Sequence, residues 1–138
     1  MYKRQLSNHN KLDNKIIRWK KIAKAASQQC NRNEIPIIAN FESSFSSDTL
    51  KKYESNINIV SNELINLNVN LHNLLEKIPS TITLICGPEG GFTLEELSLL
   101  KDNNFLEINL GKRILRSETA MLTLLANISY FFENMKGN

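Results

Sequence analysis

Residues 81–100 read TITLICGPEGGFTLEELSLL, in which an apolar run passes into a glycine-rich loop and then into a helical pattern. The run Thr81–Cys86 is β-branched and nearly all apolar, which is typical of a central parallel strand covered on both faces. Gly87–Phe92 is then the loop between strand and helix. Because α/β sheets gather ligands in the crevice outside the carboxyl ends of their strands, this loop is the first candidate for a ligand site.

The helix after this loop has a well-specified start. Thr93 and Glu96 have the spacing of a capping box, in which each side chain accepts a hydrogen bond from the other residue's backbone. Phe92 and Leu97 occupy the two positions of a hydrophobic staple. The pattern therefore predicts a helix that begins at Thr93 and runs to about Asn103.

The rest of the chain continues the alternation of strands and helices. Two further strands are predicted at Asn58–Asn62 and Phe105–Leu110, and an irregular connection is expected over Asn33–Ser47. Helical segments are predicted from caps and apolar spacing after Asp13 (Ile16, Trp19, Ile22, Ala23, Ala26), after Ser47 or Asp48 (Leu50, Tyr53, Ile57), at Leu71, Leu74, Leu75 and Ile78, and after Ser117. This alternation predicts an α/β fold with a mainly parallel sheet flanked by helices.

The last helix, which Ser117 is expected to cap, carries a wide apolar surface. Its apolar residues are Ala120, Met121, Leu124, Leu125, Ile128, Phe131 and Phe132. A helix of this kind is either deeply buried or lies in an interface.

Length and composition describe one globular domain. The chain has 138 residues, of which 41% are apolar and 22% are charged. No apolar run is long enough to span a bilayer, and no leader peptide is recognisable. Cys30 and Cys86 have the spacing of neither a disulfide framework nor a metal site, so we expect a reduced, intracellular protein without a metal. Cys86 ends an apolar strand and is expected to be a buried small hydrophobe rather than a reactive thiol.

Positive charge is concentrated at one end of the chain. The first 32 residues contain nine Lys or Arg and a single acid, Asp13, although the net charge of the whole chain is only +3. A basic end on an acidic body is typical of a protein that meets a polyanion. The alternative is that the lysines merely keep an exposed helix in solution.

The glycine-rich loop has more than one interpretation. Gly87, Gly90 and Gly91 lie within one loop, where glycine allows positive φ and lets a ligand approach the backbone closely. Neither the P-loop pattern nor the dinucleotide fingerprint is present, and Pro88 removes one backbone donor. A site that holds an adenine or a ribose by backbone groups fits better than a phosphate loop. Simple turn chemistry is the other interpretation.

A second loop carries a cluster of charges. Lys112, Arg113 and Arg116 precede a helix start, where the helix dipole favours anions, so these cations are not there for the dipole. Their chemistry favours binding of phosphate or of an anionic substrate. A salt-bridge network with Glu118 or Glu89 is the structural alternative.

Together the two loops resemble a known family. GPEGGFT at residues 87–93 with Glu96, followed by LGKRILRSETA at residues 110–120, is similar to the ribosomal RNA small-subunit methyltransferase E family. The segment RWKKIA at residues 18–23, with Gln29–Arg32 and Pro36, resembles the basic helix of that family. The resemblance therefore extends over most of the chain.

The resemblance implies a SPOUT-type α/β fold with a C-terminal trefoil knot. It implies that S-adenosyl-L-methionine lies in the knot, held by Gly87, Gly90, Leu110, Gly111, Ile114 and Leu115, and that the last helix forms a homodimer interface. Residues 1–138 correspond to a single methyltransferase domain that lacks the first strand–helix–strand unit and N-terminal barrel-like RNA-binding domain of the family.

The activity implied by the resemblance is methylation of uridine N3 in small-subunit (16S) ribosomal RNA. Arg116 is expected to stabilise the uracil anion, and Glu118 or Glu89 to accept the proton. The RNA-binding residues are expected to be Arg18, Lys20, Lys21, Arg32, Lys112 and Arg113. The partner is ribosomal RNA or the assembled small subunit, and the expected location is the cytoplasm. The alternatives are a non-catalytic remnant that binds cofactor or RNA or only dimerises, and a related knotted enzyme that acts on another RNA.

Overall fold

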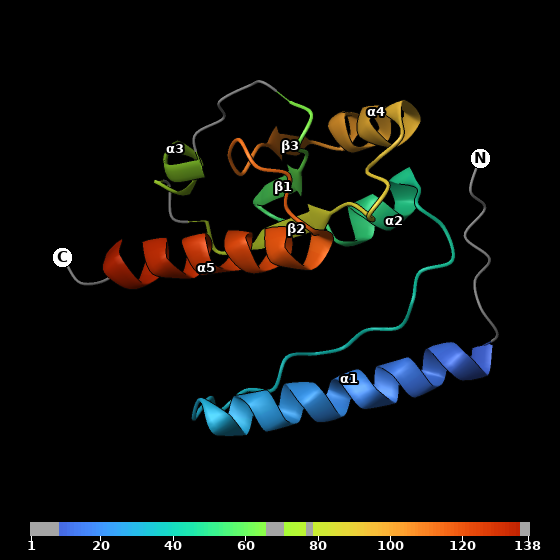
Figure 1. Ribbon diagram of the computed structural model, residues 1–138, viewed down its shortest axis with the longest axis vertical. Helices are drawn as coiled ribbons and strands as arrows, with labels where there is room; N and C mark the ends of the chain where they lie inside the picture. The colour runs from blue at the N-terminus through green and yellow to red at the C-terminus, as the bar shows by residue number, and fades with distance from the viewer. Residues whose placement is uncertain (1–8, 66–70, 77–78, 136–138) are drawn as a thin grey trace. The chain divides into compact units, whose positions relative to one another are not determined.

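Figure 1 shows the computed structural model of the chain, which describes residues 9–65, 71–76 and 79–135. The chain divides into two compact units, Met1–Ser43 and Ser44–Asn138. The first contains helix α1 and an extended segment, and the second contains a sheet with helices around it.

The second unit is built on a parallel sheet. Its described strands are β1 (Ile57–Ser61), β2 (Ile82–Cys86) and β3 (Phe105–Ile108), in the order β2-β1-β3. Both neighbours of β1 are parallel to it. All three strands therefore end at the same edge of the sheet. The α/β class with a mainly parallel sheet is confirmed.

Helices cover both faces of this sheet. The four helices of the second unit are α2 (Ser47–Lys52), α3 (Leu71–Leu75), α4 (Leu94–Asp102) and α5 (Ser117–Met135). One apolar cluster joins strand residues to α3 and α5, and contains Ile59, Leu75, Ile108, Leu124 and Ile128. A second cluster joins the other face to α2 and α4, and contains Leu50, Val60, Leu100 and Phe105. Because successive strand residues point to opposite faces, Ile59 and Val60 each anchor one cluster.

The predicted start of α4 is confirmed in detail. The Thr93 hydroxyl accepts a hydrogen bond from the Glu96 N–H at 3.2 Å, and the Glu96 carboxylate accepts one from the Thr93 N–H at 2.9 Å. Phe92 and Leu97 both pack against the cluster of Leu50 and its neighbours. The capping box and the staple were predictable because each depends only on residues a few positions apart.

Two other boundaries differ from the predictions, and a third position is not tested. Ser46, rather than Ser47 or Asp48, caps α2 by accepting from the Thr49 N–H at 3.4 Å, since neighbouring serines offer equivalent caps that spacing cannot separate. Ile57 belongs to β1, where it pairs with Ile82, and not to the preceding helix. The predicted helical position Ile78 lies outside the described residues.

The position of β2 also differs from the prediction. The sequence indicates a central strand, but among the described strands the centre is β1 and β2 lies at the edge. All five residues of β2 are half-buried, whereas Ile59 and Val60 in β1 are completely buried. The apolar composition of a strand thus shows that it pairs and packs, but not which neighbours it has.

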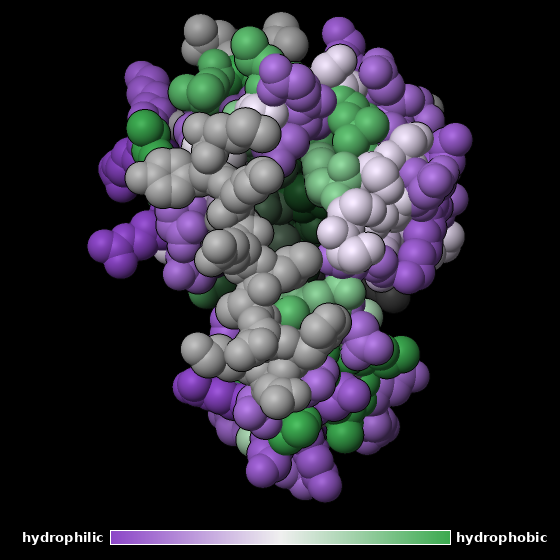
Figure 2. Space-filling model, turned by 90° about the vertical axis from the view of Figure 1, so that its right-hand side faces the viewer, coloured by the Kyte–Doolittle hydropathy of each residue, from purple (hydrophilic) through white to green (hydrophobic). Residues whose placement is uncertain are grey.

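Helix α1 of the first unit spans His9–Gln29 and begins before the predicted cap, Asp13. Leu12 lies one turn before the buried Ile16 and continues the apolar stripe upstream, so Asp13 lies inside the helix. The Trp19 ring lies 5.6 Å from the Phe41 ring but remains 42% exposed, so this side chain is only partly covered. Figure 2 shows hydrophobic and hydrophilic side chains interspersed on the visible surface. Among the described helices, none has the length and hydropathy required to cross a membrane.

Candidate functional site

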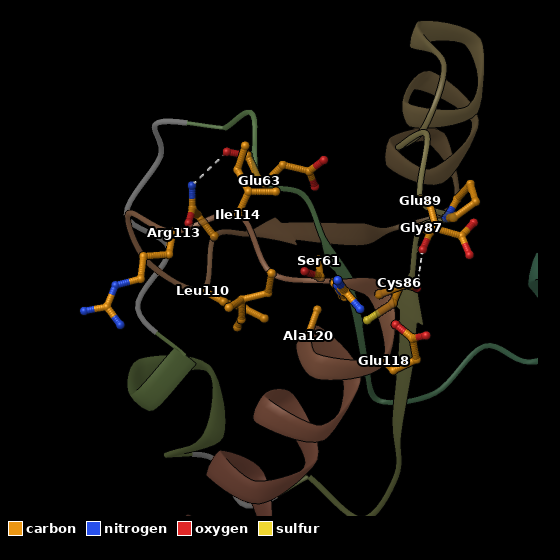
Figure 3. A pocket seen from close by; sticks show the side chains of 15 residues that line it. Ser61, Glu63, Cys86, Gly87, Glu89, Leu110, Arg113, Ile114, Glu118 and Ala120 are labelled. Atoms are coloured by element: carbon orange, nitrogen blue, oxygen red, sulfur yellow. Dashed lines mark hydrogen bonds between the residues drawn. The ribbon is translucent and has the colours of Figure 1, made fainter.

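A pocket lies at the carboxyl ends of the three strands. Its volume is about 460 Å³, within the range of roughly 300–1,000 Å³ that is usual for small-molecule and cofactor sites. Ser61 ends β1, Cys86 ends β2, and Asn109 directly follows β3, and all three line the pocket. Figure 3 shows Ser61 and Cys86 above Ala120 at the start of α5. This is where an α/β sheet is expected to hold a ligand.

Both predicted loops contribute to this pocket. The predicted site residues that line it are Gly87, Glu89, Leu110, Arg113, Ile114, Leu115, Arg116 and Glu118. Gly90, Gly111 and Lys112, which were also predicted, are not among its lining residues. The structure therefore brings the two motifs together around one cavity, although they lie in separate parts of the sequence.

Three polar residues of the pocket were missed at the sequence level. Ser61 and Glu63 lie at and just after the end of β1, and Asn109 follows β3. The signal that could have found them is their position, since the ends of parallel strands meet at one edge of the sheet. The sequence around them contains no recognisable motif.

The glycines of the loops have different structural roles. A Cβ atom on Gly87 would lie 2.9 Å from the Phe92 ring, so any larger residue there would force the ring to shift. Gly91 has φ of +70° and its N–H donates to the Pro88 carbonyl at 2.9 Å, which makes a tight turn. Gly111 has φ of +123°, which other residues rarely adopt. Turn conformation therefore explains some of the glycines in these loops, in addition to any role they have in the pocket.

Ser117 does not cap α5 as predicted. It is the first residue of that helix, and its hydroxyl donates a hydrogen bond to the Gly87 carbonyl oxygen instead. The first backbone bond of the helix runs from the Ala120 N–H to the Arg116 carbonyl oxygen at 2.8 Å. Ser117 thus ties the loop after β2 to the start of α5, between the candidate residues Arg116 and Glu118.

Two asparagines join the loops that follow β1 and β3. The buried Asn62 donates from its side chain to the Glu107 carboxylate at 2.6 Å, and from its backbone to the Ile108 carbonyl at 2.9 Å. The Asn109 side chain donates to the carbonyl oxygens of Glu63 and Ile65. The three loops of the pocket are therefore connected by hydrogen bonds of neutral side chains.

The charged side chains lie at the exposed rim. Glu89, Arg113, Arg116 and Glu118 are all exposed, and Figure 3 shows Arg113 extending away from the other labelled side chains. Within the described part of the chain, no ion pair joins Glu118 to Lys112, Arg113 or Arg116, so that part of the salt-bridge alternative finds no support. These cations remain available to an anionic ligand.

Cys86 is half-buried in the pocket wall, and this burial raises the pKa of its thiol. The thiol is therefore less ionised at neutral pH than a thiol in water, which agrees with the expectation of an unreactive cysteine. The described residues contain no group of three or more His, Cys, Asp or Glu side chains that could hold a metal ion.

The remaining predicted residues lie on exposed surface. Arg18, Lys20, Lys21 and Arg32 are exposed in the first unit, on α1 and just after it. The apolar surface of α5 is divided: Ala120, Leu124 and Ile128 are buried, whereas Leu122, Leu125 and Tyr130 are 67%, 46% and 70% exposed. One side of the helix is therefore buried and the opposite side is exposed, and the interface stays a prediction.

Comparisons with known proteins agree on one family. Residues 2–129 match the family model described as an RNA methyltransferase domain. The ribosomal RNA small subunit methyltransferase E of Buchnera aphidicola subsp. Schizaphis graminum is 34% identical over 122 residues, which cover 88% of this chain and 48% of that protein. These matches confirm the resemblance inferred from the motifs.

Solved structures give the same result. A methyltransferase of Legionella pneumophila with bound S-adenosylmethionine has a TM-score of 0.80 and 28% identity, covering 92% of this chain and 50% of that one. A ribosomal RNA small subunit methyltransferase E of Neisseria gonorrhoeae bound to S-adenosylmethionine has a TM-score of 0.71 and 27% identity, covering 94% of this chain and 52% of that one. The chain spans about half the length of the curated relatives it matches.

Proposed function

The chain belongs to the RNA methyltransferase domain family, and from this premise we propose that it methylates ribosomal RNA of the small subunit with S-adenosylmethionine as methyl donor. We propose uridine N3 as the methylated atom. One observation carries the proposal: the two motifs that resemble small-subunit methyltransferase E line a single pocket at the carboxyl ends of the strands.

The pocket residues fit this cofactor. Gly87, Pro88 and Leu110 line the pocket and have no polar side chain, so they can bind polar atoms only through the backbone. This suits a ligand whose adenine and ribose are held by the main chain. Two solved structures with TM-scores of 0.80 and 0.71 bind S-adenosylmethionine. When bound, the cofactor supplies an activated methyl group. We propose that Gly87, Leu110, Ile114 and Leu115 contact it directly, with Gly90 and Gly111 shaping the loops.

The reaction requires removal of a proton, since uracil N3 is normally protonated and not nucleophilic. Arg116 at the rim would stabilise the negative charge that the uracil ring carries after deprotonation. Glu118 or Glu89, which both line the pocket, would accept the proton directly or through water. Much of the acceleration would come from holding the base in line with the methyl group.

The RNA partner is proposed from the exposed cations. Arg18, Lys20, Lys21 and Arg32 in the first unit, and Lys112 and Arg113 beside the pocket, would contact phosphates of the RNA or of the assembled small subunit. A uridine in folded RNA would have to be unstacked to reach the pocket. Ribosomal RNA as substrate implies that the protein works in the cytoplasm.

We further propose a trefoil knot and a longer sheet. The Asn109 bonds to Glu63 and Ile65 bring the segment after β3 against the segment after β1, as a threaded chain would. The half-buried, apolar β2 is suited to pair with a further strand. Residues 1–138 would then belong to a single methyltransferase domain.

A homodimer through α5 is the proposed assembly. The exposed side chains Leu122, Leu125 and Tyr130 give this helix an outer apolar surface in addition to its buried one. Exposed apolar surface of this kind marks protein–protein interaction sites.

The test is transfer of a labelled methyl group from S-adenosylmethionine to small subunits that lack the modification. We expect incorporation, with N3-methyluridine as the product in nucleoside mass spectrometry. Arg116→Ala should abolish transfer while Lys101→Ala, which removes an exposed cation on α4, leaves it intact. Binding of the cofactor without transfer would indicate a non-catalytic remnant, and a different methylated nucleoside would exclude uridine N3.

A further inference from the structure

The side chain of Asn109 makes three hydrogen bonds that join two loops of the pocket. Its Nδ2 donates to the carbonyl oxygens of Glu63 at 3.2 Å and of Ile65 at 2.9 Å. Its Oδ1 accepts from the Gly111 N–H at 2.8 Å. A dashed line in Figure 3 marks the bond to Glu63. The half-buried amide of Asn109 thus links the backbone after β1 to the backbone after β3.

The backbone that Asn109 holds belongs to the pocket. Glu63 on one loop and Leu110 on the other both line the cavity. Gly111, whose N–H donates to Asn109, has φ of +123°, a conformation open to glycine but rarely adopted by other residues. Residues Glu63–Ile65 lie in neither a helix nor a strand. Two of their carbonyl oxygens accept hydrogen bonds from the Asn109 side chain.

The amide itself offers little to a ligand. An asparagine side chain has two N–H donors, and in Asn109 both are used within the protein. Its effect on a bound molecule therefore has to pass through the loops that it holds. This distinguishes Asn109 from Arg116 and Glu118, whose exposed side chains line the same pocket.

We propose that Asn109 is a positioning residue for cofactor binding, which holds the loops after β1 and β3 in the arrangement that binds the cofactor. The inference rests on the proposed function. Since ordering a loop costs free energy at the moment of binding, a pocket that is ordered beforehand binds more tightly. Loss of Asn109 should therefore weaken cofactor binding, rather than slow the chemical step once the cofactor is bound.

The experiment compares Asn109→Ala with Asn103→Ala in the full chain. Asn103 is buried beyond the end of α4, where its side chain donates to the Leu99 carbonyl at 2.8 Å and accepts from the Ser47 hydroxyl at 2.7 Å. It does not line the pocket. The two variants lose the same amide, one beside the pocket and one away from it, so thermal unfolding measures the structural effect of each.

We expect Asn109→Ala to raise the Kd for S-adenosylmethionine in calorimetry by about tenfold, a change of about 1.4 kcal/mol. The transfer rate at saturating cofactor should stay within about twofold of the wild type, which corresponds to less than about 0.5 kcal/mol. Asn103→Ala should lower Tm without changing Kd. Asn109→Asp keeps the acceptor for Gly111 but turns an oxygen toward two carbonyls, so it should bind at least as weakly as the alanine variant.

Unchanged Kd in folded Asn109→Ala and Asn109→Asp would overturn the inference, as would an equal loss of affinity in Asn103→Ala. A wild-type chain that binds no S-adenosylmethionine would overturn the proposed function as well. The two failures are therefore distinguishable by the wild-type titration alone.

Discussion

Neutral and charged side chains have separate tasks in the pocket. The hydrogen bonds that join its loops come from Asn62, Asn109 and Ser117, which carry no charge. Arg116 and Glu118 lie at the exposed rim, free to meet a substrate. Substitutions in the first group should alter the shape of the pocket and the affinity for the cofactor, whereas substitutions in the second should alter recognition of RNA and the transfer itself.

Cys86 allows the cofactor site to be tested without measuring activity. Because burial raises the pKa of its thiol, less thiolate is present at pH 8 than for free N-acetylcysteine, and alkylation by iodoacetamide should be slower and keep rising at higher pH. S-adenosylmethionine should slow the reaction further, since Cys86 lines the pocket. Timed alkylation followed by peptide mass spectrometry gives both rates.

Cys30 is the internal control for this measurement. It is exposed and lies in the first unit of the chain, so the cofactor should leave its alkylation rate unchanged. Equal protection of both cysteines, or no protection of Cys86, would contradict the assignment of the pocket.

Which site residues were predictable depended on their surroundings in the sequence. Arg116 and Glu89 were found because they belong to motifs, and both line the pocket. Asn109 and Ser61 were missed because their neighbours in space come from other strands. Ser117 was assigned to the wrong partner, since a serine at a helix start can cap locally or bind a distant carbonyl, and spacing alone shows only the first.

At the scale of single elements, local signals were more dependable than those that involve two elements. The start of α4 was predicted correctly because Thr93 and Glu96 satisfy each other's backbone within one turn. The edge position of β2 was not, because strand order is decided by contacts between distant segments. The same contrast explains why α2 was predicted although its cap is Ser46 and not the predicted Ser47 or Asp48.

Removal of the α4 cap should destabilise the fold in a pH-dependent way. The Glu95 carboxylate is hydrogen-bonded first by its own backbone N–H and then by the Thr93 side chain, and both bonds lower its pKa. A lowered pKa in the folded state means that ionised Glu95 stabilises the fold above its unfolded-state pKa. That contribution is lost as the pH falls through the lowered folded-state pKa.

Thr93→Ala should therefore lower the free energy of unfolding by about 1 kcal/mol at pH 7. Urea denaturation at pH 7 and again near pH 3 should show that the difference from the wild type becomes smaller in acid. Thr93→Ser keeps the hydroxyl and should remain close to the wild type at both values. A difference that is independent of pH would show that Glu95 has no part in the cap.

At the scale of the whole molecule, α5 connects the pocket to the proposed assembly. One side of the helix packs against the sheet through Leu124 and Ile128, while Leu122 and Leu125 face outward. Helices of this kind were recognisable from the sequence as broadly apolar, but only the structure separates the buried side from the exposed one. Because the two sides of α5 are distinct, a substitution on the exposed side can test the proposed interface without altering the core.

Leu122→Glu should convert the dimer to a monomer with little loss of stability, since the side chain is 67% exposed within one protomer. Sedimentation velocity measures the change. Leu94→Glu places the same charge on another exposed leucine, at 82%, at the start of α4, and should leave the proposed dimer unchanged. Dissociation by both variants, or by neither, would contradict an interface at α5.

The basic surface of α1 is a second property of the whole molecule. A double variant, Lys20→Glu with Lys21→Glu, should weaken binding to small-subunit RNA and reduce its dependence on salt, because each lost phosphate contact lowers the slope of log K against log salt by about 0.7–0.9. Filter binding at several salt concentrations gives this slope. Lys101→Glu on α4 is the matched charge reversal, and an equal effect there would show that only net charge matters.

The parallel sheet also has a consequence for how the protein folds. Parallel neighbours cannot be joined by a tight turn, and β3 joins β1 from farther along the chain than β2 does. The pocket uses the ends of all three strands, so it is complete only when both pairings have formed. A ligand that binds only the finished pocket should slow unfolding and leave the refolding rate unchanged, which stopped-flow kinetics with and without S-adenosylmethionine can measure.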